Sequence, residues 1–199
     1  MGDARLAFYY DLGSPYAWLA AERIDRLFEE SELEPPEWKP VLLGGLFKQF
    51  GRGSWALTDR REVGIAEIAG RAAERGLPPL KLPDPWPTSY VYAARAATWA
   101  KREGHGVTFA LAGFRRAFTE GLDLADPENV RAVAADEGLD PEALDAAVAT
   151  PELKDELKRA TAEAADLGVR GIPSVVVGEE VFWGDDQLER AVGFASETR

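Results

Sequence analysis

The 199-residue chain contains no cysteine. This absence excludes disulfide bonds, thiolate metal sites and a protein thiol as nucleophile, so any thiol chemistry must use a sulfur brought by another molecule. Histidine is nearly as scarce, since the single one, His105, lies in the hydrophilic stretch KREGHGV, where we expect it to be solvated. A lone histidine in that setting gives no support to a Ser-His-Asp arrangement. We therefore expect no metal site and no catalytic triad.

Long apolar runs and positive charge are also in short supply. No uninterrupted apolar run approaches membrane-spanning length, and Asp3, Arg5 and Asp11 stand too close together for a secretory signal. We therefore expect a cytoplasmic protein. The 23 basic residues against 35 acidic ones give a net charge of -12 at pH 7, which would repel nucleic acid and anionic membranes over most of the surface. Small molecules or other proteins are the expected partners.

The chain does have a hydrophobic content of 46%, enough for one domain, or for one domain with a large insertion. Its patterning predicts a strand, a helix and a second strand over residues 5–10, 15–30 and 38–43, which makes a parallel pair of strands. An Ala-rich helical middle follows, and a helix, a β-hairpin and a last helix close the chain. The later helices are expected over residues 58–75, 89–103, 107–119, 127–136, 141–149 and 151–167, the hairpin strands over 174–177 and 180–183, and the last helix from 186.

The turn between the first strand and the first helix carries Ser14, Pro15 and Tyr16. Serine is a favoured N-cap, and proline at the first helical position loses no useful hydrogen bond, so capping alone explains the pair. A strand-to-helix turn also directs backbone N–H groups and the positive end of the helix dipole at whatever lies above the serine. An anion such as a thiolate would be stabilised there, and the turn alone leaves both interpretations open.

The order of elements is the plan of the thioredoxin fold as it occurs in DsbA-like proteins. Four motifs make the chain resemble one branch of that family, the 2-hydroxychromene-2-carboxylate isomerases and kappa-class glutathione transferases. They are FYYDLGSPYAWLA, PVLLGGLFK, GVRGIPS and FWGDDQL, and the likeness spans nearly the whole chain. The resemblance implies an α/β fold with a thioredoxin-like domain over residues 1–44 and 150–199 and an all-helical insertion domain over residues 45–149.

The resemblance also implies a site for glutathione or another low-molecular-weight thiol. Ser14 would donate a hydrogen bond to the sulfur from the Ser14-Pro15-Tyr16 turn, and the backbone of Ile172, before an expected cis-proline at Pro173, would bind the cysteinyl part. Asp186, beside Asp185 at the start of the last helix, would pair with the ammonium of the γ-glutamyl end, although plain capping also explains two acids there. Lys48 matches the lysine of the family's GGxFK motif. Ser14 and Ala17 stand where redox members carry their two cysteines, so disulfide oxidoreductase activity is not expected.

Two features depart from the family or stay ambiguous. Relatives commonly have asparagine where this chain has Arg52, and the family's next lysine aligns only approximately, near Arg60. With Lys48 and Arg61, these arginines form a basic window that suits either a solvated surface or a carboxylate site. Five aromatic residues fit either the core or the roof of an aromatic-substrate pocket, and none is assigned to the site: Trp86, Trp99, Phe114, Phe118 and Trp183.

The function implied is a glutathione-dependent isomerase of aromatic catabolism, acting on an unsaturated aromatic keto acid through a thiolate held by Ser14. Two alternatives remain open: a kappa-type glutathione transferase, and a non-catalytic DsbA-like binding or chaperone module. Family resemblance further implies a homodimer.

Overall fold

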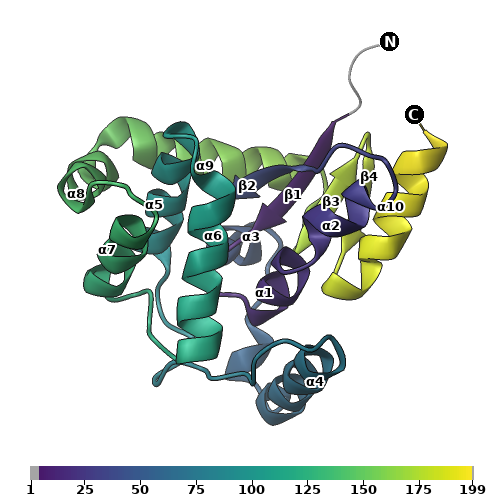
Figure 1. The fold of residues 1–199 in the computed structure, drawn as a ribbon, viewed down its shortest axis with the longest axis horizontal. Coiled ribbons are helices and arrows are strands. Elements are labelled where there is room, and N and C mark those ends of the chain that lie inside the picture. Colours follow the sequence, from purple (N-terminus) through teal and green to yellow (C-terminus); the bar gives the residue numbers. More distant parts are fainter. Residues whose placement is uncertain (1–4, 199) are drawn as a thin grey trace.

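The computed structural model describes residues 5–198, which form a four-stranded sheet covered by helices (Figure 1). The strands lie in the order β2-β1-β3-β4, where β1 is Leu6–Tyr10, β2 is Glu37–Pro40, β3 is Ser174–Val177 and β4 is Glu180–Trp183. β1 pairs parallel with β2 and antiparallel with β3, and β4 pairs antiparallel with β3. The α/β thioredoxin-like fold is therefore confirmed, and both hairpin strands have the predicted bounds.

Alternate residues of the sheet face two different parts of the core. Phe8 and Tyr10 of β1 point to the side covered by α1, α2, α5, α6 and α10, whereas Ala7 and Tyr9 point toward α3 and α9. All four side chains are at most 2% exposed. Burial of a large apolar side chain contributes about 1.5–3 kcal/mol, so a one-residue slip of β1, which exchanges its two faces, would be costly. The burial of side chains on both faces of β1 therefore fixes the register of this strand in the sheet.

Ten α-helices surround the sheet in the described residues. The first two are α1 Pro15–Ala21 and α2 Ile24–Glu29; the next are α3 Leu43–Gln49, α4 Arg61–Glu74, α5 Val91–Arg102 and α6 Gly106–Arg115; the last are α7 Pro127–Asp136, α8 Pro141–Ala149, α9 Pro151–Asp166 and α10 Leu188–Glu197. Short 3-10 turns cover Trp55–Leu57 (η1) and Asp185–Gln187 (η3), and a π-helical turn, Arg116–Glu120 (η2), extends α6. In Figure 1, α5 to α8 lie together on one side of the sheet and α4 stands below α1. None of these helices is long and apolar enough to cross a membrane.

The first predicted helix is wrong in one respect, because residues 15–30 form two helices. Arg23 has φ −142° and ψ −13°, and this non-helical residue separates α1 from α2. Its guanidinium donates to the carbonyl oxygen of Asp185 and pairs with Glu189, 2.7 Å away, so both partners come from the other end of the chain. These contacts, which the local pattern does not contain, anchor Arg23 outside both helices.

The second predicted strand is also too long, since it ends at Pro40 and the chain turns into α3 at Leu43. Two glycines made residues 43–49 a poor helix on local propensity. Tertiary hydrogen bonds fix its entry: Leu42 N donates to Thr161 Oγ1 at 3.0 Å and Leu43 N to Asp11 Oδ2 at 2.8 Å. The separation of residues 45–149 as an insertion domain stays a prediction.

Candidate functional site

Ser14 lies at the N-cap of α1, as its sequence position predicted, and is 6% exposed. Its Oγ accepts a hydrogen bond from Ala17 N at 3.3 Å, with Pro15 at the first helical position. Within residues 5–198 the Ser14 hydroxyl has no acceptor for its own proton. The side chain therefore caps the helix with a lone pair and keeps its proton available for a ligand.

The turn before Ser14 is held from three sides. Asp11 Oδ1 accepts from Gly13 N at 2.8 Å, and Trp86 Nε1 donates to the Gly13 carbonyl at 3.2 Å. The ring of Tyr90 lies so close to Gly13 that a Cβ built there would come within 2.3 Å of it. Only glycine fits at this position, and the close approach brings the aromatic residues of the helical region up to the serine turn.

The Ile172–Pro173 peptide bond is cis, which confirms that prediction. Gly184 N donates to the Pro173 carbonyl at 2.9 Å, so the proline turn is tied to the chain just before η3. Within the described residues neither the N–H nor the carbonyl of Ile172 has a backbone partner. The backbone of Ile172 is thus open to a ligand, next to a cavity that Ser14 also lines.

This cavity, which we call the polar cavity, has a volume of about 390 Å³ and joins most of the predicted site. Of the predicted residues, it is lined by Ser14, Tyr16, Ile172, Pro173, Asp185 and Asp186. Pro15 lines the neighbouring cavity described below. Lys48 is exposed at the last turn of α3 and belongs to the lining of neither cavity. The structure therefore brings all the predicted residues together except Lys48.

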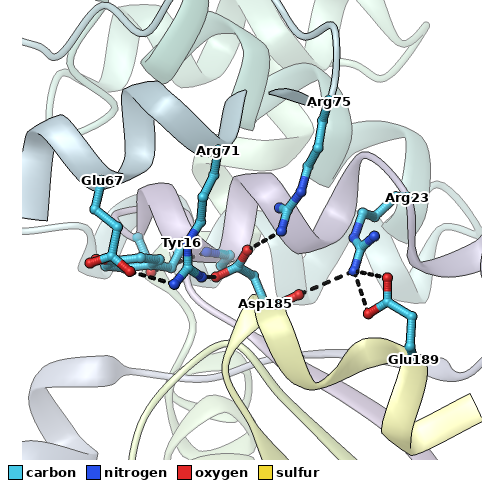
Figure 2. A network of polar contacts seen from close by, with 9 residues as sticks. Tyr16, Arg23, Glu67, Arg71, Arg75, Asp185 and Glu189 are labelled. Carbon is cyan, nitrogen blue, oxygen red and sulfur yellow. Dashed lines mark hydrogen bonds and ion pairs between the residues drawn. The ribbon is translucent and has the colours of Figure 1, made fainter. Parts of the chain in front are cut away.

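Glu67, Arg71 and Asp185 line the polar cavity and form ion pairs with one another (Figure 2). Arg71 of α4 pairs with both Glu67 and Asp185, and Arg75 Nη2 lies 2.6 Å from the second oxygen of Asp185. Tyr16 donates its hydroxyl to Glu67 at 3.0 Å. Partial burial raises the pKa of Tyr16 and the bond to Glu67 raises it further, so the phenol stays protonated. This network fastens α4 to the turn before α10.

The two acids before the last helix, Asp185 and Asp186, differ in burial and in ion pairing. Asp185 is 1% exposed, and its carboxylate is held between Arg71 of α4 and Arg75, the residue that follows α4. Asp186 is exposed, lines the polar cavity and has no ion pair within residues 5–198. Arg52 likewise pairs with no acid there: its guanidinium lies 4.5 Å from the centre of the Trp183 ring and donates to the Arg170 carbonyl. The polar cavity is thus lined by one carboxylate and one guanidinium that have no ion-pair partner within residues 5–198.

A second cavity of about 540 Å³, which we call the apolar cavity, shares Ser14, Leu43, Phe47 and Trp55 with the first. Aromatic and aliphatic side chains form most of its wall, among them Trp86 and Tyr90. Trp86 and Trp183 therefore line cavities, whereas Trp99, Phe114 and Phe118 belong to the core. Arg60 and His105 line neither cavity. Within the described residues no group of three or more His, Cys, Asp or Glu side chains is arranged to hold a metal ion.

Sequence reasoning missed the residues that the tertiary structure brings to the site. Asp11, Trp55, Glu67, Arg71 and Tyr90 line the cavities but were not singled out. Glu67 and Arg71 stand four residues apart, a spacing that indicates a helical ion pair but not its second partner, Asp185. Asp11 carried a better signal, as an acid directly after a buried strand and three residues before Ser14.

The class of protein is defined by a thioredoxin-like sheet, together with a cis-proline turn and a serine-capped helix that line one cavity. The family profile of the DSBA-like thioredoxin domain matches residues 5–193. The chain belongs to this family.

Individual relatives place the chain near one branch of the family. It is 28% identical over 191 residues to the 2-hydroxychromene-2-carboxylate isomerase of Sphingobium xenophagum, covering 92% of this chain and 93% of that protein. It is 24% identical over 200 residues to glutathione S-transferase kappa 1 of Homo sapiens, covering 91% and 86%. A solved structure of 2-hydroxychromene-2-carboxylate isomerase has the same fold, with a TM-score of 0.82 at 21% identity and coverage of 97% and 96%.

Proposed function

We propose that the protein is a glutathione-dependent isomerase that acts on an unsaturated aromatic keto acid. The observation that carries the proposal is the position of Ser14, on the wall shared by a polar and an apolar cavity, with its hydroxyl proton free. A thiol in the polar cavity and an aromatic compound in the apolar cavity would meet at this residue. The similarity to a 2-hydroxychromene-2-carboxylate isomerase supports the reaction type.

The residues of the polar cavity fit glutathione chemically. Asp186 supplies an unpaired carboxylate for an ammonium group, and Arg52 an unpaired guanidinium for a carboxylate. The open backbone of Ile172, which lines the same cavity, can pair with a peptide group, as an added strand does. Tyr16, Pro15 and Pro173 shape the walls around Ser14. Lys48 would join this site only through a change in its position, so we assign carboxylate binding to Arg52.

Bound glutathione would supply a nucleophilic thiolate that adds reversibly to the unsaturated compound. The task of the chain is to hold that group ionised and close to its acceptor. Ser14 donates a hydrogen bond to the sulfur, and such a bond to an anion favours the charged form. Phe47 and Trp55 line both cavities with Ser14, and beside such apolar surface the electrostatic effect of the hydroxyl is stronger than in water. We further propose a cytoplasmic homodimer, in line with the sequence analysis.

The test is turnover of 2-hydroxychromene-2-carboxylate by the pure protein with and without glutathione, followed by ultraviolet absorbance and product analysis, with free thiol titrated in parallel. An isomerase changes the spectrum only when glutathione is present and leaves the thiol concentration constant. Consumption of thiol with formation of an adduct would instead identify a kappa-type transferase, which the same two cavities suit. Absence of thiol-dependent turnover with either kind of product would favour the non-catalytic binding module.

A further inference from the structure

The apolar cavity contains one acid that the proposed chemistry does not use. Asp11 follows β1 directly, is 6% exposed and lines the cavity on the same wall as Ser14. Its two oxygens each accept one backbone hydrogen bond of 2.8 Å, from Gly13 N and Leu43 N. These bonds fix the plane of the carboxyl group, and each oxygen keeps a further lone pair.

No basic side chain balances this acid. The lining of the apolar cavity includes no lysine, arginine or histidine, and Asp11 has no ion pair within residues 5–198. The guanidinium carbon of Arg61 lies 5.3 Å from the centre of the Trp86 ring, but Arg61 is not part of the lining. An anion in the cavity would therefore meet a buried negative charge across apolar walls, where repulsion is weakly screened.

Other polar groups of the lining are neutral. Ser54, Thr88 and Ser89 offer hydroxyls, and Tyr90 presents a phenol. Lys48, on the helix that carries Leu43, is exposed and does not line this cavity. The cavity is thus suited to an uncharged aromatic ring, with one strong hydrogen-bond acceptor beside it.

We propose that Asp11 selects the compound that enters the apolar cavity, admitting an uncharged aromatic ring that bears a hydroxyl or N–H donor and rejecting one that presents an anion there. The inference rests on the proposed function for the role of this cavity as the acceptor site. A keto acid would accordingly place its ring and hydroxyl toward Asp11, and its carboxylate outside the apolar cavity.

The selection depends on pH. Burial raises the pKa of Asp11 to about 6, although the two backbone hydrogen bonds act in the opposite direction. The titratable neighbours are Tyr10 and Tyr90, whose pKa values burial also raises, so both stay neutral up to pH 8. Because the folded pKa is raised, Asp11 is ionised well above pH 6 and neutral well below it. The barrier to anions is present at pH 7.5 and largely gone at pH 5.

The experiment measures binding without any thiol, so its failure leaves the thiol chemistry untouched. Three probes share one ring system: 2-naphthol carries a donor, 2-methoxynaphthalene has no donor, and naphthalene-2-sulfonate stays anionic at every pH used. Affinities are measured by calorimetry in an Arg52→Ala background, which removes the unpaired cation of the polar cavity. Asp11→Asn is compared with Asp25→Asn, a control that removes a partly buried acid, which accepts a hydrogen bond from Trp38 and lies outside both linings.

At pH 7.5 we expect 2-naphthol to bind about tenfold or more tightly than either other probe. Asp11→Asn should weaken 2-naphthol and strengthen the sulfonate about tenfold, whereas Asp25→Asn should change neither. Lowering the pH to 5 should strengthen the sulfonate about tenfold with Asp11 intact, a result that does not depend on the folding of any Asp11 variant. A sulfonate affinity that changes neither with pH nor with Asp11→Asn would overturn the proposal. An equal change in the affinities of all three probes in Asp11→Asn would also overturn it, because that result indicates a structural role alone.

Discussion

The activation of a bound thiol by Ser14 is the most direct test of the candidate site. The hydroxyl proton is free, and a hydrogen bond to a charged group contributes about 1.5–3 kcal/mol. One pKa unit corresponds to about 1.4 kcal/mol, so the hydroxyl alone can lower the pKa of the bound thiol by about one to two units. The perturbation that isolates this contribution is Ser14→Ala.

The helix that follows Ser14 adds little to this effect. α1 has only seven residues, Pro15 carries no N–H, and Ala17 N is already bonded to Ser14 Oγ. In the Ser14→Ala variant the N–H of Ala17 is released and can turn to the sulfur, which recovers part of the lost stabilisation. We therefore expect the pKa of bound glutathione to rise by about one unit rather than two.

The assay is the ultraviolet absorbance of the thiolate in the glutathione complex, titrated against pH for wild type and Ser14→Ala. Ser54→Ala is a matched control, because Ser54 also caps a short helical turn, η1, by accepting from Ala56 N at 3.2 Å, but does not line the polar cavity. Thermal melts account for the loss of a cap, about 1 kcal/mol in either variant. Superimposable titration curves for wild type and Ser14→Ala would reduce Ser14 to a helix cap.

Four further outcomes are expected. Asp186→Asn should weaken glutathione binding about tenfold at an unchanged melting temperature, because a charge-assisted bond is lost from an exposed residue. Asp185→Asn should cost about 3 kcal/mol of unfolding free energy, because Arg71 and Arg75 lose their shared partner; calorimetry that finds both variants equally stable would contradict this division. With Ser14 and Ala17 at the positions of a cysteine pair, the protein should not catalyse insulin reduction, and measurable precipitation by pure protein would refute that expectation. Light scattering should give twice the monomer mass of 21.7 kDa, and a monomer across a dilution series would count against the dimer.

Several parts of the molecule follow from the sequence because their causes are local. Asp126, Asp140 and Thr150 each precede a proline, and these caps start α7, α8 and α9 where the pattern predicted. Gly178 has φ +63° and lies between β3 and β4, so a glycine in the turn marked the hairpin. The four family motifs likewise indicated Ser14 and the cis-proline turn.

Other parts were decided only when distant segments met. The start of α3 depends on hydrogen bonds from Leu42 N and Leu43 N to side chains of Thr161 and Asp11. The sequence pattern of residues 42–49 does not predict these bonds. The motif FWGDDQL contained two adjacent acids, but ion pairs with Arg71 and Arg75, at the end of α4, bury Asp185, whereas Asp186 lines the cavity without an ion pair. The family motif that contains Lys48 implied a ligand contact, whereas the path of α3 left this residue outside both linings. The sequence thus determined which charged and polar side chains were available to the site. The packing of α3 and α4 determined which of the charged side chains stayed without an ion-pair partner, because ion pairing and burial depend on neighbours far away in the chain.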